Sequence, residues 1–173
     1  NLSNQKQSRV LTNCEGKLDG VETIAHELGH AYHGHLIQDH RPLNRTYTMP
    51  VAETASDFNE TLVMNAAIAR ARGQEKLALL EQRLQDYAPV ICDIYSRFLF
   101  EREVFEERKG GFLFPARLCR IMAETQKTAY GPGLDPACLH PYMWVNNVHY
   151  YYTTLSFYNF PYAFSALLAT GLY

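Results

Sequence analysis

The sequence predicts a mostly α-helical domain with one short β element near its N-terminus. Apolar residues recur at helical spacing through most of the 173 residues, and prolines and glycines fall where helices begin or end. Only one short segment has the partly β-branched composition of a strand. Hydrophobic residues make up 47% of the chain and charged residues 20%, which suits a folded domain with a core. We see no linker, so we expect a single domain over residues 1–173.

The first two elements follow from local patterns. Residues 8–14 are partly β-branched and precede a turn-like Glu-Gly-Lys at 15–17, which predicts a strand. Asp19-Gly-Val-Glu22 is typical of a capping box with Asp19 in the cap position, so a helix is expected from there to about residue 35. Its apolar face is predicted to hold Val21, Ile24, Ala25, Leu28 and Tyr32.

Prolines and glycines place the remaining helices. A loop runs from Pro42 to about Thr48, Pro50 suits the first turn of a second helix, and Gly73 suits its end. A third helical region covers about residues 74–109, and Pro89 is expected to bend or split it because proline lacks the N–H that a helix needs. Further helices are predicted over residues 115–130 and from 157 to the end, with a Gly-Pro-Gly break at 131–133.

Charge and composition exclude several classes of function. The net charge is −2, with no basic stripe, so we expect no nucleic-acid partner. No run of 18 apolar residues occurs, so we expect no membrane span. The chain opens without an apolar leader, and its cysteines are scattered as expected for free thiols, which together predict a cytoplasmic location. Those cysteines are Cys14, Cys92, Cys119 and Cys138.

An HExxH motif lies inside the first predicted helix, at residues 26–30. Residues four apart lie on the same helical face, so His26 and His30 can converge on one metal ion. Glu27 points to the side of that pair, where its carboxylate can act as a base without being a ligand. Zinc lowers the pKa of a bound water to about 7, which makes that water a nucleophile. The motif predicts one Zn²⁺ per chain, and the small Gly29 allows a close neighbour.

A catalytic zinc needs a third protein ligand and one open position. Glu53 is the strongest candidate, because it is flanked by alanines early in the second predicted helix; the alternative is an ordinary solvated carboxylate. Asp57 and Glu60 follow at about one and two turns, so either could accept the remaining N–H of a ligating imidazole. His33 and His35 are interpreted as packing or surface residues.

Three blocks of the sequence resemble a known family. They are Ser-Arg-Val-Leu-Thr-Asn-Cys-Glu-Gly-Lys, then Thr-Ile-Ala-His-Glu-Leu-Gly-His-Ala-Tyr-His-Gly, then Ala-Glu-Thr-Ala-Ser-Asp-Phe-Asn-Glu, and the C-terminal run from His149 is similar too. The resemblance is to the oligoendopeptidase F branch of the thimet oligopeptidase-like (M3) metallopeptidases. It implies a helical, zincin-type catalytic domain that cuts internal bonds of short peptides in a deep channel. It also implies His26, His30 and Glu53 as zinc ligands and Glu27 as base.

The resemblance further implies a His and Tyr group from the C-terminal block that donates hydrogen bonds to the oxyanion and to the substrate backbone. His149 and Tyr162 are the best matches, and Tyr158 is next. Such donors in a dry cleft stabilise the charge of the transition state. The alternative is that this aromatic helix only packs in the core. Asp57 departs from the family, in which many relatives carry an uncharged residue there.

Length is the larger departure, because members of this family are several times longer. The chain is therefore interpreted as an excised catalytic segment that lacks the opposite wall of the channel. The apolar surface left exposed predicts self-association through the channel face. Two alternatives stay open: a zinc exopeptidase with the same ligands, and a zinc-binding module without turnover.

Overall fold

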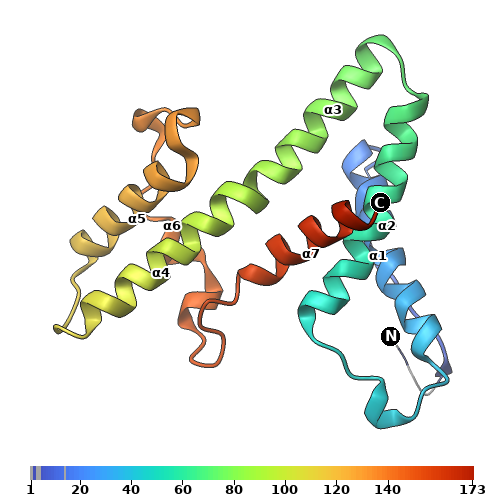
Figure 1. Ribbon diagram of the computed structural model, residues 1–173, viewed down its shortest axis with the longest axis horizontal. Coiled ribbons are helices and arrows are strands. Elements are labelled where there is room, and N and C mark those ends of the chain that lie inside the picture. Colours follow the sequence, from blue (N-terminus) through green and yellow to red (C-terminus); the bar gives the residue numbers. More distant parts are fainter. Residues whose placement is uncertain (1, 3–4, 14) are drawn as a thin grey trace. The chain divides into compact units, whose positions relative to one another are not determined.

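The computed structural model of the chain describes residue 2, residues 5–13 and residues 15–173. The described residues are mostly helical, which confirms the helical part of the predicted fold class (Figure 1). The helices are α1 Leu18–Ile37, α2 Met49–Arg70, α3 Gly73–Ala88, α4 Ile94–Arg108, α5 Pro115–Tyr130, α6 Met143–Asn146 and α7 Phe160–Leu172. Shorter helical turns are η2 Pro42–Asn44, η3 Pro89–Asp93, η4 Gly131–Gly133, η5 Pro136–Cys138 and η6 Val148–Tyr151.

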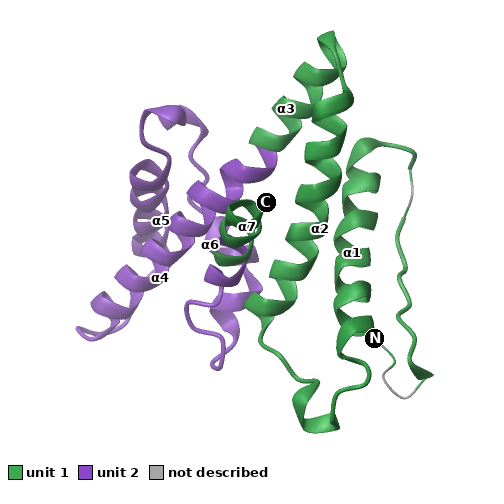
Figure 2. Cartoon of the chain, turned by 45° about the vertical axis from the view of Figure 1, so that its right-hand side comes forward, with its two compact units in different colours: residues 1–84, 164–173 green, residues 85–163 purple. Residues whose placement is uncertain are grey.

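The chain divides into two compact units (Figure 2). Unit 1 comprises residues 1–84 and 164–173, and it holds α1, α2 and most of α3 and α7. Unit 2 comprises residues 85–163, and it holds η3, α4, α5 and the short turns that follow. The HExxH motif and Glu53 therefore belong to unit 1, whereas His149, Tyr158 and Tyr162 belong to unit 2.

The predicted N-terminal strand is not seen in the part of the chain that the structure describes. Residues 8–13 form no ladder, and Cys14 lies outside the described residues. The one bridge recorded here joins Leu2 and Gln7, outside the predicted segment. A strand needs a neighbouring strand to take up its backbone N–H and C=O groups. The segment is instead tied to α1, where the Ser8 hydroxyl donates to the Ala31 carbonyl at 3.4 Å.

The predicted cap of the first helix, Asp19, lies two residues after the observed one. The N-cap of α1 is Lys17, which makes no side-chain hydrogen bond to the helix, and Asp19 lies within the first turn. The carboxylate of Asp19 accepts from the N–H of Gly20 at 3.2 Å. An acidic residue in the first turn still stabilises the helix through the partial positive charge at its N-terminus. Asp19 therefore acts by charge, and the capping box does not form.

Several helix boundaries agree with the prediction. α5 coincides with the predicted 115–130, and α2 ends just before Gly73, whose φ of 55° allows the chain to turn into α3. At Pro89 the α-helical pattern widens into the π turn η3, so the predicted helical region is divided there although its backbone stays helical. The last helix begins at Phe160 and not at Phe157, because Phe157 has a φ of 59°, which a right-handed helix cannot contain.

Helices α1 and α2 run antiparallel, side by side in unit 1 (Figure 2). Their closest approach is at Gly29: a Cβ there would lie 2.6 Å from the Ala55 carbonyl oxygen and 2.6 Å from the Cα of Ser56. Asn59 also crosses between the helices and donates to the Ala25 carbonyl at 2.5 Å. Because only glycine fits at this point, Gly29 sets the spacing between the two helices.

This packing corrects the predicted apolar face of α1. Ala25 and Gly29 are buried, but Val21, Ile24, Leu28 and Tyr32 are exposed, Tyr32 by 65%. α2 lies on the edge of α1 that carries small residues, because the backbone of α2 is so close at Gly29 that even a Cβ would clash with it. The larger apolar side chains of α1 are consequently left on the surface of the described chain.

Gly29→Ala is expected to destabilise unit 1 by about 1–3 kcal/mol, the usual cost of forcing a methyl group into a packed interior. The atoms that the new Cβ would meet are backbone atoms, which cannot rotate away. Thermal unfolding followed by circular dichroism measures the effect. Gly20→Ala is the matched control on the same helix: nothing lies within 4 Å of its Cβ, so the variant is expected to be as stable as the parent or slightly more so. Equal melting temperatures for both variants would contradict the prediction.

Each unit has its own apolar core. In unit 1, Met64, Ala71 and Leu79 are buried together where α2 and α3 meet. In unit 2, Phe100, Ile121 and Met122 form the buried centre, between α4 and α5. Among the described residues, none of the helices combines the length and the apolar character needed to cross a membrane.

Candidate metal centre

The two histidines of the HExxH motif lie one turn apart on α1, on the face that meets α2. Their ring centroids are 5.0 Å apart and their planes nearly perpendicular, at 85°. Both side chains are about a quarter exposed. The i, i+4 spacing therefore brings two imidazoles to one partly dry position, as expected from the sequence.

Glu53 comes to the same position from α2. Its Oε2 lies 3.3 Å from His26 Nε2 and 3.6 Å from His30 Nε2. Zinc bonds of about 2.0–2.2 Å in a tetrahedron put neighbouring ligand atoms about 3.3–3.6 Å apart. The donor set of two imidazole nitrogens and one carboxylate oxygen therefore fits a zinc ion. A tetrahedral ion held by three ligands keeps its fourth position open.

The other ring nitrogen of His26 faces two carboxylates. Nδ1 lies 3.4 Å from Glu60 Oε2 and 3.6 Å from Asp57 Oδ1. An acceptor at Nδ1 fixes the tautomer in which Nε2 is free to bind a metal. His26, Asp57 and Glu60 also lie close enough to one another to hold an ion. The group with two imidazoles matches the nitrogen preference of zinc better, and an orienting role for Asp57 and Glu60 stays a prediction.

The charges of this cluster favour a cation. Hydrogen bonds with Glu53, and then with Glu60, raise the pKa of His26 to about 10. The hydrogen bond with His26 in turn lowers the pKa of Glu53. Burial raises the pKa of Asp57 to about 6, although a hydrogen bond with Ser165 opposes this. A divalent cation would supply the positive charge that these carboxylates stabilise.

Two further residues hold the carboxylates in place, and sequence reasoning missed both. Ser56 is fully buried, and its hydroxyl lies 2.9 Å from the Glu53 carbonyl and 3.1 Å from Glu53 Oε2. Because residues three apart are neighbours on a helix, the position of Ser56 after Glu53 could have predicted this contact. Arg83 Nη1 lies 3.8 Å from Glu60 Oε1, and its Nη2 donates to the Thr61 hydroxyl at 3.0 Å. No sequence signal predicted Arg83, because it comes from α3.

Glu27 differs from the other acidic residues of the site. It follows His26 on α1 and is half-buried. Within the described part of the chain, its carboxylate makes no hydrogen bond or ion pair. Glu53, Asp57 and Glu60 are all engaged by His26. Glu27 thus stands apart from the carboxylates that His26 engages, and its role as a base stays a prediction.

The sequence matches the family model described as peptidase family M3 over residues 4–173, which is nearly the whole chain. The chain belongs to peptidase family M3.

Relatives of this M3 chain carry related names. It is 28% identical to "Oligoendopeptidase F, chromosomal" of Lactococcus lactis subsp. cremoris, over 89% of this chain and 26% of that protein. It is 26% identical to "Group B oligopeptidase PepB" of Streptococcus agalactiae, over 89% of this chain and 26% of that protein. It is 24% identical to "Oligopeptidase PepF" of Bacillus subtilis, over 89% of this chain and 23% of that protein. The chain thus spans about a quarter of the length of these relatives. No solved structure matches it.

The C-terminal candidates of the M3 chain lie in unit 2. His149 belongs to η6 and its ring lies 6.0 Å from the ring of Tyr158. His149 also lines a cavity of about 450 Å³, together with the buried Glu101. Tyr162 lies in α7 and is 38% exposed. The structure therefore brings His149 and Tyr158 together within their own unit, and their role at the metal centre stays a prediction.

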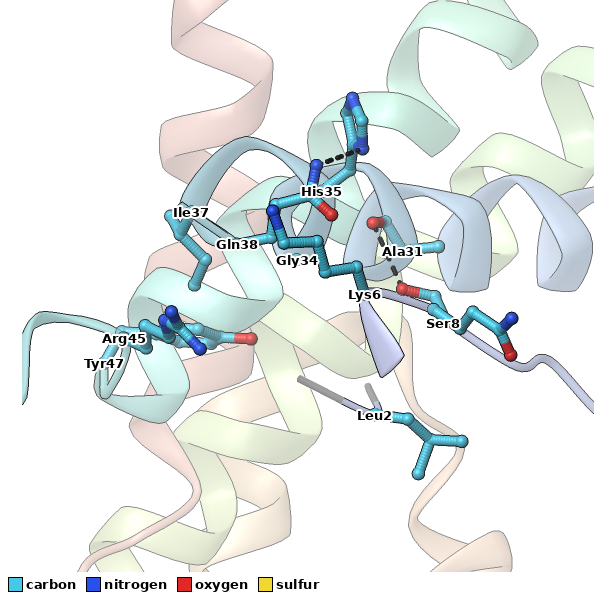
Figure 3. A pocket seen from close by; sticks show the side chains of 11 residues that line it. Leu2, Lys6, Ser8, Ala31, Gly34, His35, Ile37, Gln38, Arg45 and Tyr47 are labelled. Carbon is cyan, nitrogen blue, oxygen red and sulfur yellow. Dashed lines mark hydrogen bonds between the residues drawn. The ribbon is translucent and has the colours of Figure 1, made fainter. Parts of the chain in front are cut away.

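The two remaining histidines of α1 have partners away from the cluster. The ring of His33 packs on Tyr47, with 4.4 Å between centroids, and His35 Nδ1 lies 3.0 Å from Gln38 Nε2. His35 also lines a pocket of about 250 Å³ between the N-terminal segment, the end of α1 and the following loop (Figure 3). None of the candidate zinc ligands lines this pocket. Packing and surface roles, as the sequence predicted, account for both residues.

Proposed function

We propose that this chain is the zinc-binding catalytic part of a peptidase that hydrolyses internal bonds of short oligopeptides. The observation that carries the proposal is the convergence of His26 Nε2, His30 Nε2 and Glu53 Oε2 from two helices. Membership of peptidase family M3 and the names of the oligoendopeptidase F relatives support it. His26, His30 and Glu53 are the proposed ligands of one zinc ion.

Bound zinc would supply Lewis-acid chemistry, making a water acidic near neutral pH and polarising a carbonyl. Glu27 is the proposed base: its unpaired carboxylate accepts the proton of the attacking water and then gives it to the leaving amine. Ser56 holds the Glu53 carboxylate toward the histidines. Glu60 accepts from His26 Nδ1, with Asp57 Oδ1 beside it at 3.6 Å, and this contact keeps Nε2 free for the ion.

The proposed substrates are short, extended peptides. His149, Tyr162 and Tyr158 are the proposed donors to the developing oxyanion and the substrate backbone. A zinc exopeptidase with the same ligands would need a group that holds a free peptide terminus, and we assign none. Internal cleavage is therefore the preferred reaction.

The test combines zinc content by elemental analysis with cleavage of a short quenched fluorescent peptide blocked at both ends. We expect about one zinc per chain and cleavage that a chelator abolishes and added zinc restores. Blocked termini exclude an exopeptidase, so mass spectrometry of the products identifies the internal bond that is cut.

The other outcomes are equally informative. Zinc without cleavage would favour the zinc-binding module without turnover, with the remainder of a longer protein needed for activity. No zinc in a folded, zinc-supplied sample would show that the three ligands do not hold the ion, and the proposal would fall.

A further inference from the structure

Arg83 is a largely buried cation next to the candidate metal centre. It lies in the part of α3 that belongs to unit 1, and its side chain is 15% exposed. Nη2 donates to the hydroxyl of Thr61, which is 1% exposed, at 3.0 Å. This hydrogen bond fixes the guanidinium against α2. A buried charge is costly unless it is paired, so the partner of Arg83 matters to the site.

Glu60 is an ion-pair partner of Arg83, and it lies between Arg83 and His26. Glu60 Oε1 lies 3.8 Å from Arg83 Nη1, and Glu60 Oε2 lies 3.4 Å from His26 Nδ1. Each carboxylate oxygen therefore serves one neighbour. At 3.8 Å the guanidinium attracts Oε1 by charge and not through a hydrogen bond. This attraction favours the rotation of the Glu60 carboxylate in which Oε2 meets the imidazole.

The charges make this restraint necessary. Glu53, Asp57 and Glu60 all approach His26, and like charges at this spacing repel one another. Among the ion pairs recorded for the described residues, Arg83 supplies the only Lys or Arg contact to these three carboxylates. Without the positive charge of Arg83, repulsion from Asp57 would favour moving the Glu60 carboxylate away from His26.

We propose that Arg83 is a positioning residue for the zinc centre: it anchors Glu60, which orients His26 so that Nε2 faces the ion. The inference rests on the proposed function, because it assumes that His26 is a zinc ligand. Arg83 touches neither the ion nor the substrate. Its effect therefore reaches the metal through Glu60.

The first test is zinc affinity of the full chain, measured by competition with a chromophoric chelator. Arg83→Gln is expected to weaken zinc binding about tenfold, the lower end of the effect of groups that orient metal ligands. Arg83→Lys keeps the charge but has one nitrogen in place of the two that face Glu60 and Thr61, so we expect an intermediate zinc affinity. Arg117→Gln is the matched control: it removes an Arg–Glu pair in unit 2, between Arg117 and Glu107, and is expected to leave zinc affinity unchanged.

The second test is a double-mutant cycle with Glu60→Gln. If Arg83 acts through Glu60, the double variant should bind zinc as weakly as Glu60→Gln alone. Independent tenfold losses, or Arg83→Gln with wild-type affinity, would overturn the inference. Circular dichroism checks that each variant folds; if Arg83→Gln does not, the Arg83→Lys cycle decides.

These results separate the inference from the function on which it rests. If wild-type chain binds no zinc, or Glu53→Ala binds it as tightly as wild type, the proposed ligand set fails. If wild type binds zinc and Glu53→Ala does not, but the Arg83 variants are unaffected, only the role of Arg83 fails.

Discussion

Glu27→Gln is expected to keep the zinc and to lower the rate of peptide hydrolysis by about 10²–10⁴-fold, the usual contribution of a general base. Glutamine has nearly the same shape as glutamate but cannot accept a proton at neutral pH. The carboxylate of Glu27 makes no recorded hydrogen bond or ion pair among the described residues, so its replacement leaves the other contacts of the site intact. The measurement is kcat on the quenched peptide, alongside zinc content.

A matched control separates the base from a general loss of charge. Glu106→Gln removes a carboxylate on α4 that, among the described residues, forms an ion pair with the exposed Lys109 alone, and it is expected to keep full activity. A Glu27→Gln chain that still cleaved peptide at the wild-type rate would remove Glu27 from its proposed role. A chain that lost zinc as well would make Glu27 a contributor to the metal site.

Glu53→Ala is expected to weaken zinc binding by more than about 100-fold, beyond the range typical of groups that only orient a ligand. The substitution removes the oxygen that faces both imidazoles, and it leaves the hydroxyl of Ser56 without its carboxylate acceptor. Zinc retained after dialysis against a chelator, measured by elemental analysis, gives the result.

Two comparisons make the result specific. Glu75→Ala, at an exposed position in the first turn of α3, is expected to retain zinc as the parent does. Glu60→Ala is expected to fall between the two, because Glu60 meets His26 at Nδ1 and not at the metal-facing nitrogen. Unchanged zinc in Glu53→Ala would show that another residue supplies the third ligand.

Sequence reasoning succeeded where the information is local. The helices are mostly where proline, glycine and apolar spacing predicted them, and α5 coincides with its predicted range. His26 and His30 share a face because the helical period alone puts residues i and i+4 one above the other. The change to a π turn at Pro89 likewise follows from the missing N–H of proline.

Predictions from the sequence were wrong where a neighbouring element decides which backbone groups pair or which side chains are buried. The predicted strand over residues 8–14 needs a partner strand, which the described residues do not provide. Val21, Leu28 and Tyr32 follow helical spacing, yet they are exposed, because α2 packs on the edge of α1 that carries Ala25 and Gly29. Periodicity predicts that a helix has an apolar side, but it does not identify which edge a neighbour will cover.

The sequence by itself determined the helices, the HExxH pair and the candidates for a third ligand, since each depends on residues a few positions apart. Only the tertiary structure decided that Glu53 Oε2 reaches both imidazoles, that Asp57 and Glu60 both face His26, and that Arg83 arrives from α3 to pair with Glu60. The physical reason is Gly29. Its missing side chain lets α2 approach α1 closely enough for side chains from two helices to share one site.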